Sequence, residues 1–154
     1  MKEKKTIVLT VSKVFPKTHP KAGNTTGFVE SLCMLFTGNN TKIHTIRGNY
    51  ELWRKRAEKI NSGEAILSIR YWSGKPYNSK QVEICRLEKI GVEKILFDDY
   101  LYGFKINEQQ FSNISEIAKN DGLANNDFEH WFKGYDFSQP MAIIHFTNFR
   151  YTQS

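Results

Sequence analysis

The chain has 154 residues, of which 40% are hydrophobic and 14% aromatic, enough to bury one sizeable core but hardly two. We therefore expect a single domain over residues 1–154. Lysine and arginine outnumber aspartate and glutamate by 22 to 16. The resulting net charge of +6 favours anionic partners, although a merely solvated basic surface gives the same composition.

The cysteines and the short motifs exclude several classes of protein. Cys33 and Cys85 form no CxxC pair and lie near no histidine at metal-ligand spacing, so we expect no metal and no cofactor. The chain also lacks a glycine-rich phosphate loop, GxSxG and HExxH. No run approaches the roughly 18 apolar residues of a membrane span, and no export signal is recognisable. Because thiols are few, we expect a reduced, cytoplasmic protein.

Hydrophobic spacing in the first part of the chain predicts one strand and two helices. Alternating β-branched residues predict a strand over residues 5–14, followed by a loop. Apolar residues at helical spacing predict a helix over residues 25–37. A second helix is predicted over residues 49–62, with Asn49 as its N-cap and an apolar stripe that includes Trp53.

The remainder of the chain mixes strands and helices. We expect a hairpin whose first strand covers residues 65–72 and whose second strand begins at residue 81, followed by a strand at 92–97. Two helices at 113–119 and 126–133, with Gly122 between them, and a closing strand at 141–149 complete the chain. This order lacks the regular βαβ alternation of a parallel sheet. We therefore expect an α+β protein with a mixed or antiparallel sheet and attached helices.

The stretch KIHTIR, residues 42–47, concentrates titratable and hydroxyl side chains. Lys42 and Thr45 are three residues apart, a spacing at which a loop entering a strand can bring an amine and a hydroxyl together. A threonine attacks well only if a base takes its proton, and a lysine can do so when burial or neighbouring cations lower its pKa. His44 and Arg47 are such neighbours. The alternative is that the two isoleucines fill the core while the cations reach solvent.

The pattern K-x-x-T-x-R, formed by Lys42, Thr45 and Arg47, resembles the signature of the ASCH superfamily, small domains of PUA-like fold that are linked to RNA. Three further segments resemble the family: residues 49–72, 117–132 and 141–149. The similarity covers roughly residues 40–150, and the loop and helix at about 15–37 are an atypical elaboration. The resemblance implies a PUA-like (ASCH) β-barrel of mixed sheet with flanking helices.

One branch of this superfamily removes the acetyl group from N4-acetylcytidine with a threonine, a lysine and a glutamate. The resemblance implies Thr45 as the nucleophile and Lys42 as the base. The position of the glutamate is occupied by Asp121, which is one methylene shorter, and Asn120 and Glu116 are nearby substitutes. An aspartate before a glycine also commonly ends a helix, so a structural role for Asp121 stays open.

A PUA-like barrel implies a cleft in which a base stacks on aromatic side chains while cations meet phosphate or ribose oxygens. Trp72 and Tyr77 flank the turn of the hairpin and, with Lys75, are candidate substrate contacts. Arg47 is the expected anchoring cation, and His44 lies beside it in sequence. The other two tryptophans fit a core position better.

Two functions of different class follow from these observations. The first is an RNA- or nucleotide-binding domain that recognises a base in a cleft around the KxxTxR signature. The alternative is a metal-independent amidohydrolase of N-acylated cytidine-type nucleosides, so that catalysis itself stays open. The expected partner is RNA or a modified nucleoside, and no membrane. The sequence also leaves open an interaction domain without a nucleic-acid role. It does not decide among RNA, DNA and a free nucleoside, nor does it decide the oligomeric state.

Overall fold

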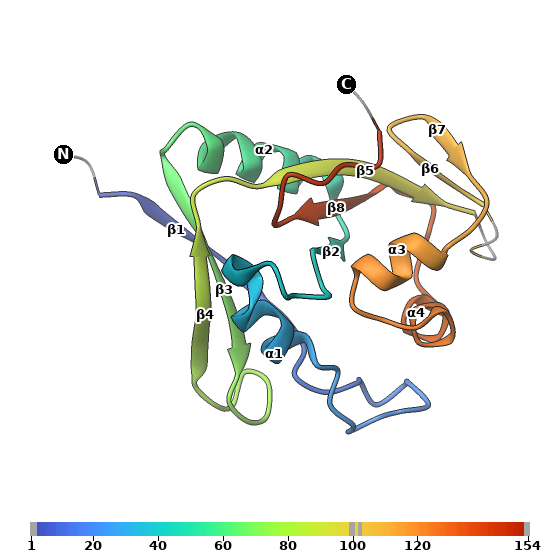
Figure 1. Ribbon diagram of the computed structural model, residues 1–154, viewed down its shortest axis with the longest axis horizontal. Coiled ribbons are helices and arrows are strands. Elements are labelled where there is room, and N and C mark those ends of the chain that lie inside the picture. Colours follow the sequence, from blue (N-terminus) through green and yellow to red (C-terminus); the bar gives the residue numbers. More distant parts are fainter. Residues whose placement is uncertain (1–2, 99–100, 102, 153–154) are drawn as a thin grey trace.

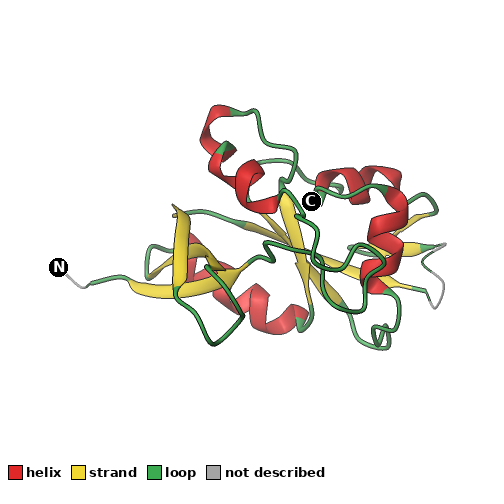
Figure 2. Cartoon of the chain, turned by 90° about the horizontal axis from the view of Figure 1, so that it is seen from below, coloured by secondary structure: helices red, strands yellow, loops and turns green. Residues whose placement is uncertain are grey.

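The computed structural model describes residues 3–98, 101 and 103–152, which form two sheets with helices on more than one side of the strands (Figure 1, Figure 2). A three-stranded sheet has the order β1 (Lys5–Thr10), β3 (Ala65–Trp72), β4 (Gln81–Leu87). A five-stranded sheet has the order β2 (His44–Arg47), β8 (Met141–His145), β5 (Gly91–Phe97), β6 (Phe104–Ile106), β7 (Gln109–Phe111).

Strand directions confirm the mixed α+β class. β1 and β3 run parallel, whereas every other described pair of neighbouring strands is antiparallel. The hairpin predicted at 65–72 and from residue 81 is present as β3 and β4. Within the described part of the chain, the strands pair into two separate sheets and close into no single barrel.

The helices agree with the prediction in position and differ in length. They are α1 (Phe28–Cys33), the short 3₁₀ helix η1 (Leu35–Thr37), α2 (Tyr50–Asn61), α3 (Ser115–Asn120) and α4 (Asn125–Phe132). Asn49 caps α2, because its side chain accepts a hydrogen bond from the Leu52 amide at 3.2 Å. Gly27 adopts a left-handed conformation with φ 80°, so α1 begins only at the following residue. None of the described helices has the length and apolar character needed to span a membrane.

The structure differs from the sequence prediction at the ends of two strands and in one hairpin. β1 ends at Thr10 rather than at residue 14, and the closing strand ends at His145 rather than at residue 149. The hairpin of β6 and β7 is absent from the prediction. Its turn residues Asn107 and Glu108 have φ of 47° and 72°, as a tight hairpin turn requires, but Asn-Glu is a far weaker hairpin signal than Asn-Gly.

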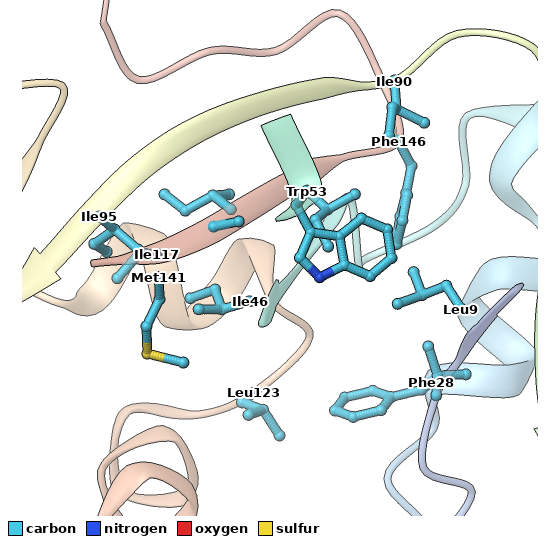
Figure 3. Close-up of a cluster of buried hydrophobic side chains, with 14 of the residues drawn as sticks. Leu9, Phe28, Ile46, Trp53, Ile90, Ile95, Ile117, Leu123, Met141 and Phe146 are labelled. Atoms are coloured by element: carbon cyan, nitrogen blue, oxygen red, sulfur yellow. The ribbon is translucent and has the colours of Figure 1, made fainter. Parts of the chain in front are cut away.

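A single cluster of buried apolar side chains joins the two sheets to the helices. Figure 3 shows Leu9 of β1, Phe28 of α1 and Trp53 of α2 in this cluster, together with Ile46 of β2. Trp53 is 5% exposed, which confirms the predicted core position. Because β2 packs on this core through Ile46, the residues on either side of Ile46 are held rigidly, and these belong to the KxxTxR pattern.

Candidate active site

Lys42 lies in the loop that enters β2, directly beside the corner between α3 and α4. Its backbone forms an isolated antiparallel bridge with Asp121, and the next amide, that of Ile43, donates to the Asn120 carbonyl at 2.8 Å. Gly122 follows at the corner with φ 84°. A Cβ at Gly122 would lie 3.1 Å from the Cβ of Lys42, so this corner of the chain needs a glycine in order to approach the lysine so closely.

Lys42 and Asp121 form a buried ion pair. The Lys42 Nζ lies 3.0 Å from the Asp121 Oδ1 and donates a second hydrogen bond to the Asp121 carbonyl at 2.9 Å. Lys42 is 1% exposed and Asp121 5% exposed. The ammonium group also lies 4.0 Å from the centre of the Phe28 ring. The aspartate therefore reaches the lysine in spite of its shorter side chain.

Burial shifts the protonation of this pair. It lowers the pKa of Lys42 from its usual value, an effect that Asp121 opposes and that the positive charge of Arg47 reinforces. For Asp121, burial alone would raise the pKa, but Lys42 and His44 outweigh it and hold the pKa below its usual value. The carboxylate is thus ionised, and the amine releases its proton more readily than a lysine in water.

Arg47 fixes the hydroxyl of Thr45. The guanidinium donates to the Thr45 Oγ1 at 2.8 Å and is itself held by the Thr10 carbonyl at 2.7 Å, at the end of β1. Thr45 is 2% exposed. Because the Thr45 oxygen accepts a hydrogen bond from the Arg47 guanidinium, the hydroxyl proton points away from Arg47, and a negative charge on this oxygen is stabilised.

These four side chains border one small cavity. It is lined by Val11, Ser12, Phe28, Lys42, Thr45, Ile46, Arg47, Asp121, Trp131 and Phe132. The cavity offers about 20 Å³ to solvent, which is room for about one water molecule. The structure thus brings the predicted catalytic residues together, in a space that a nucleobase enters only after a wall is displaced.

The loop before α1 covers the side of α4 that forms this wall. His19 is buried, with its Nε2 3.0 Å from the Asp127 carbonyl, and the Lys21 ammonium lies 2.8 Å from the Asp127 Oδ2. Phe15 packs edge-on against the ring of Trp131, with centroids 5.7 Å apart. The atypical elaboration at 15–37 therefore contributes to the closure of the cavity, a placement for which the sequence contains no signal.

His44 lies behind the cavity rather than in its lining. The side chain is fully buried, with Nε2 2.7 Å from the Tyr151 hydroxyl and Nδ1 3.3 Å from the Asp121 Oδ1, although Nδ1 is not aligned for a hydrogen bond. His145 faces it from β8 and pairs with Glu93 at 2.7 Å. Burial lowers the pKa of both histidines. His44 thus supports Asp121 and has no route to a substrate here, whereas the buried Glu93 and the half-buried Tyr151 are partners that no motif had indicated.

The residues predicted on the hairpin tip lie apart from this cavity. Trp72 and Tyr77 have ring centroids 5.1 Å apart, and Tyr77 is 85% exposed. Lys75 is also exposed. None of the three lines the cavity, so the structure does not join the tip to the KxxTxR residues. Asn120 and Glu116 are likewise outside the lining, and Asn120 donates to the Tyr151 hydroxyl at 3.0 Å.

Among the described residues, no three histidine, cysteine, aspartate or glutamate side chains gather in a way that would hold a metal ion. Comparisons with protein-family models, with curated proteins and with solved structures find no match to this chain. The assignment of a function therefore depends on the geometry of the site.

Proposed function

We propose that the cavity around Lys42 and Thr45 is the active site of an amidohydrolase that acts on an N-acylated nucleobase or nucleoside of the N4-acetylcytidine type. One observation carries the proposal: a buried lysine, ion-paired with Asp121, borders the same cavity as a threonine whose oxygen is fixed by Arg47. Burying charges in this way costs stability, and such arrangements occur preferentially at functional sites.

The reaction divides into two steps. Lys42 first releases its ammonium proton to solvent, and the Thr45 oxygen then attacks the acyl carbon while its own proton passes to the neutral Lys42 amine. The bond from the acyl carbon to the base nitrogen then breaks, and Lys42 returns the proton to that nitrogen, which releases the free base and leaves an ester on Thr45. Water attacks the ester with Lys42 again as the base, and the acid and the threonine hydroxyl are regenerated.

Asp121 and Arg47 orient the two reacting groups. In its neutral form the Lys42 amine has two N–H groups, and the Asp121 carbonyl and carboxylate accept two hydrogen bonds from Nζ. The lone pair is then free for the threonine proton. The Arg47 guanidinium donates to the Thr45 oxygen, which orients this oxygen and stabilises its negative charge as the hydroxyl proton leaves.

The substrate requires a wider cavity than the one described above. The wall formed by Trp131 and by the loop around His19 is held through side chains rather than through a sheet. We expect this wall to move outward when a base binds, as lids do in many enzymes. The resemblance to the ASCH superfamily supports the same substrate class, and with it we propose that the two sheets correspond to a PUA-like barrel.

A recognition domain that binds a base without transforming it is the second candidate. It is favoured by the engagement of the Thr45 oxygen with Arg47, because an oxygen that accepts a hydrogen bond from a guanidinium is a weaker nucleophile. In that case Arg47 is the anchor for a base or phosphate oxygen, RNA or a nucleotide is the ligand, and the Thr45 hydroxyl is dispensable.

Two isosteric variants separate the candidates. Thr45→Val removes the hydroxyl and keeps the shape of the side chain, and Lys42→Met/Asp121→Asn removes the amine together with its counter-ion, so that no buried carboxylate is left unpaired. We expect the wild type to release cytidine from N4-acetylcytidine, and each variant to lose at least a hundredfold in kcat, on the scale of lost nucleophilic and acid-base catalysis. Wild-type binding without turnover, unchanged in Thr45→Val and lost in Arg47→Ala, would establish the recognition domain instead.

A further inference from the structure

A second hollow, distinct from the cavity, lies between the first half of β1 and α2. It offers about 820 Å³ to solvent. Its lining consists of Glu3, Lys4, Lys5, Thr6, Ile7, Leu52, Lys55, Arg56, Lys59, Ser62, Gly63, Glu64 and Ala65. We call it the basic groove. In Figure 1, α2 lies along the same end of the molecule as the start of β1. These two elements supply most of the lining, together with the residues just before β1 and those that lead from α2 into β3.

Positive charge dominates the basic groove. Five cationic side chains face two carboxylates in its lining. Only Lys4 has an ion pair among the described residues, with Glu88 at 3.4 Å, and both side chains of that pair are largely exposed, so it neutralises little. The other four cations lie more than 4.0 Å from any described carboxylate, and their charge is therefore available to a ligand.

The cations of α2 are arranged along one wall. Lys55 and Lys59 are one helical turn apart and thus project from the same face. Arg56 is held in place, because its guanidinium stacks on the Trp53 ring at 4.7 Å, and such stacking limits the conformational entropy that a contact would cost. Lys4 and Lys5 contribute from the opposite wall.

We propose that the basic groove binds the phosphodiester backbone of single-stranded nucleic acid. Regularly spaced phosphates match cations on two facing walls. Among the described residues, no aromatic side chain lines the groove, so this lining offers bases no stacking platform and the contact is independent of sequence. An acidic peptide fits less well, since the lining has few apolar residues, namely Ile7, Leu52 and Ala65, to form the pockets that peptide recognition uses.

The position of the groove relative to the cavity adds a consequence that rests on the proposed function. Lys5 opens β1 and Thr10 closes it, and the Thr10 carbonyl holds Arg47 beside the cavity. At about 3.3 Å per residue, these two ends of the strand are roughly 17 Å apart. An RNA strand lying in the groove would therefore need only a few nucleotides to present an acylated base at the cavity.

The test compares two variants that lose the same charge. The groove variant, Lys55→Gln/Lys59→Gln, removes two cations of the groove. The control variant, Lys105→Gln/Lys133→Gln, removes two exposed cations on β6 and at the end of α4. These two elements lie on the far side of the molecule from the start of β1 (Figure 1). Binding of a labelled oligouridine of about 12 nucleotides is followed by fluorescence anisotropy at several salt concentrations. Thermal unfolding monitored by circular dichroism verifies that both variants are folded.

The expected result is quantitative. Each lost phosphate contact reduces the slope of log K against log salt by about 0.7, so the groove variant loses about 1.4 in slope and about 25-fold in affinity at roughly 0.1 M salt. The control variant should stay within about threefold of the wild type. Equal losses in both variants, or no RNA binding by the wild type, would overturn the proposal. So would competition by polyglutamate as strong as that by unlabelled oligouridine, which would indicate an acidic peptide as the partner.

Failure of this proposal is distinguishable from failure of the proposed function. None of the four lysines lines the cavity, so hydrolysis of the free nucleoside should be the same in both variants and in the wild type. Turnover without RNA binding would refute the groove alone, whereas RNA binding without turnover would refute the active site alone.

Discussion

Removing the charge of Asp121 tests the central feature of the site, the buried ion pair. Asp121→Asn keeps the shape of the side chain but leaves Lys42 buried, at 1% exposure, without its counter-ion. Breaking a buried pair from one side typically costs about 3–5 kcal/mol in the free energy of unfolding. We therefore expect the Asn variant to be severely destabilised at neutral pH.

The upper limit of this loss follows from the protonation of Lys42. In the folded variant, Lys42 can avoid being a buried unpaired charge by losing its proton. Deprotonating a lysine whose pKa in the unfolded chain is near 10.4 costs about 4.6 kcal/mol at pH 7 but only about 2 kcal/mol at pH 9. Between these pH values the unfolded chain binds more protons than the folded variant, so the stability of the variant rises with pH. The upper limit of the penalty should thus fall by about 2.6 kcal/mol between pH 7 and pH 9.

Urea unfolding, followed by the fluorescence of the three tryptophans, measures this loss at both pH values. The control is Lys42→Met/Asp121→Asn, which has no buried charge at these two positions and should be more stable than Asp121→Asn at pH 7. An Asn variant as stable as the wild type, or a penalty that is the same at pH 7 and pH 9, would refute the description of this pair as a buried, mutually dependent pair of charges.

Three further predictions concern the surrounding structure. Burial opposes the ionisation of Glu93, but hydrogen bonds from a histidine and the C-terminal segment lower its pKa to about 2. The ionised carboxylate thus stabilises the folded state by about 3 kcal/mol above pH ~4.5, and this stabilisation is lost as the pH falls toward 2. Glu93→Gln should therefore be less stable than the wild type at pH 7, and its stability, followed by circular dichroism, should depend less on pH in the acid range. Gly122→Ala should lose about 1–2 kcal/mol in urea unfolding, because Gly122 has φ 84° and its new Cβ would crowd Lys42. Asn49→Ala should lose about 1 kcal/mol in thermal unfolding, because the hydrogen bond from the Leu52 amide to the capping side chain is lost. Asn49→Gly should lose only a few tenths of a kcal/mol, because glycine adopts the φ of 63° at this position without strain.

The elements with strong local signals could be predicted from the sequence. The apolar stripe of α2 and its Asn49 cap, and the turn-forming residues between β3 and β4, are local features, and they agree with the structure. The hairpin of β6 and β7 was missed because its strands have three residues each. The parallel pairing of β1 with β3 depends on contacts between distant segments, which periodicity does not encode.

For the site, the sequence predicted that Lys42 and Thr45 come together, but not how the surrounding residues are arranged. The spacing within KIHTIR placed Lys42 and Thr45 near each other, and both line the cavity. The same spacing could not show that His44, at the alternate position of β2, points to the far side, where it contacts Tyr151. Nor could it place the His19 loop over α4, because docking of a loop depends on tertiary contacts that have no sequence pattern.

Partition of the acyl group in the presence of hydroxylamine tests the role of Thr45 most directly. If Thr45 forms an ester with the acetyl group of N4-acetylcytidine, hydroxylamine will intercept it, and acetohydroxamate will appear at the expense of acetate while cytidine is released. Thr45→Val, shown to be folded, should form neither product. Undiminished release of cytidine by Thr45→Val would contradict the account, because the threonine would then not be the nucleophile.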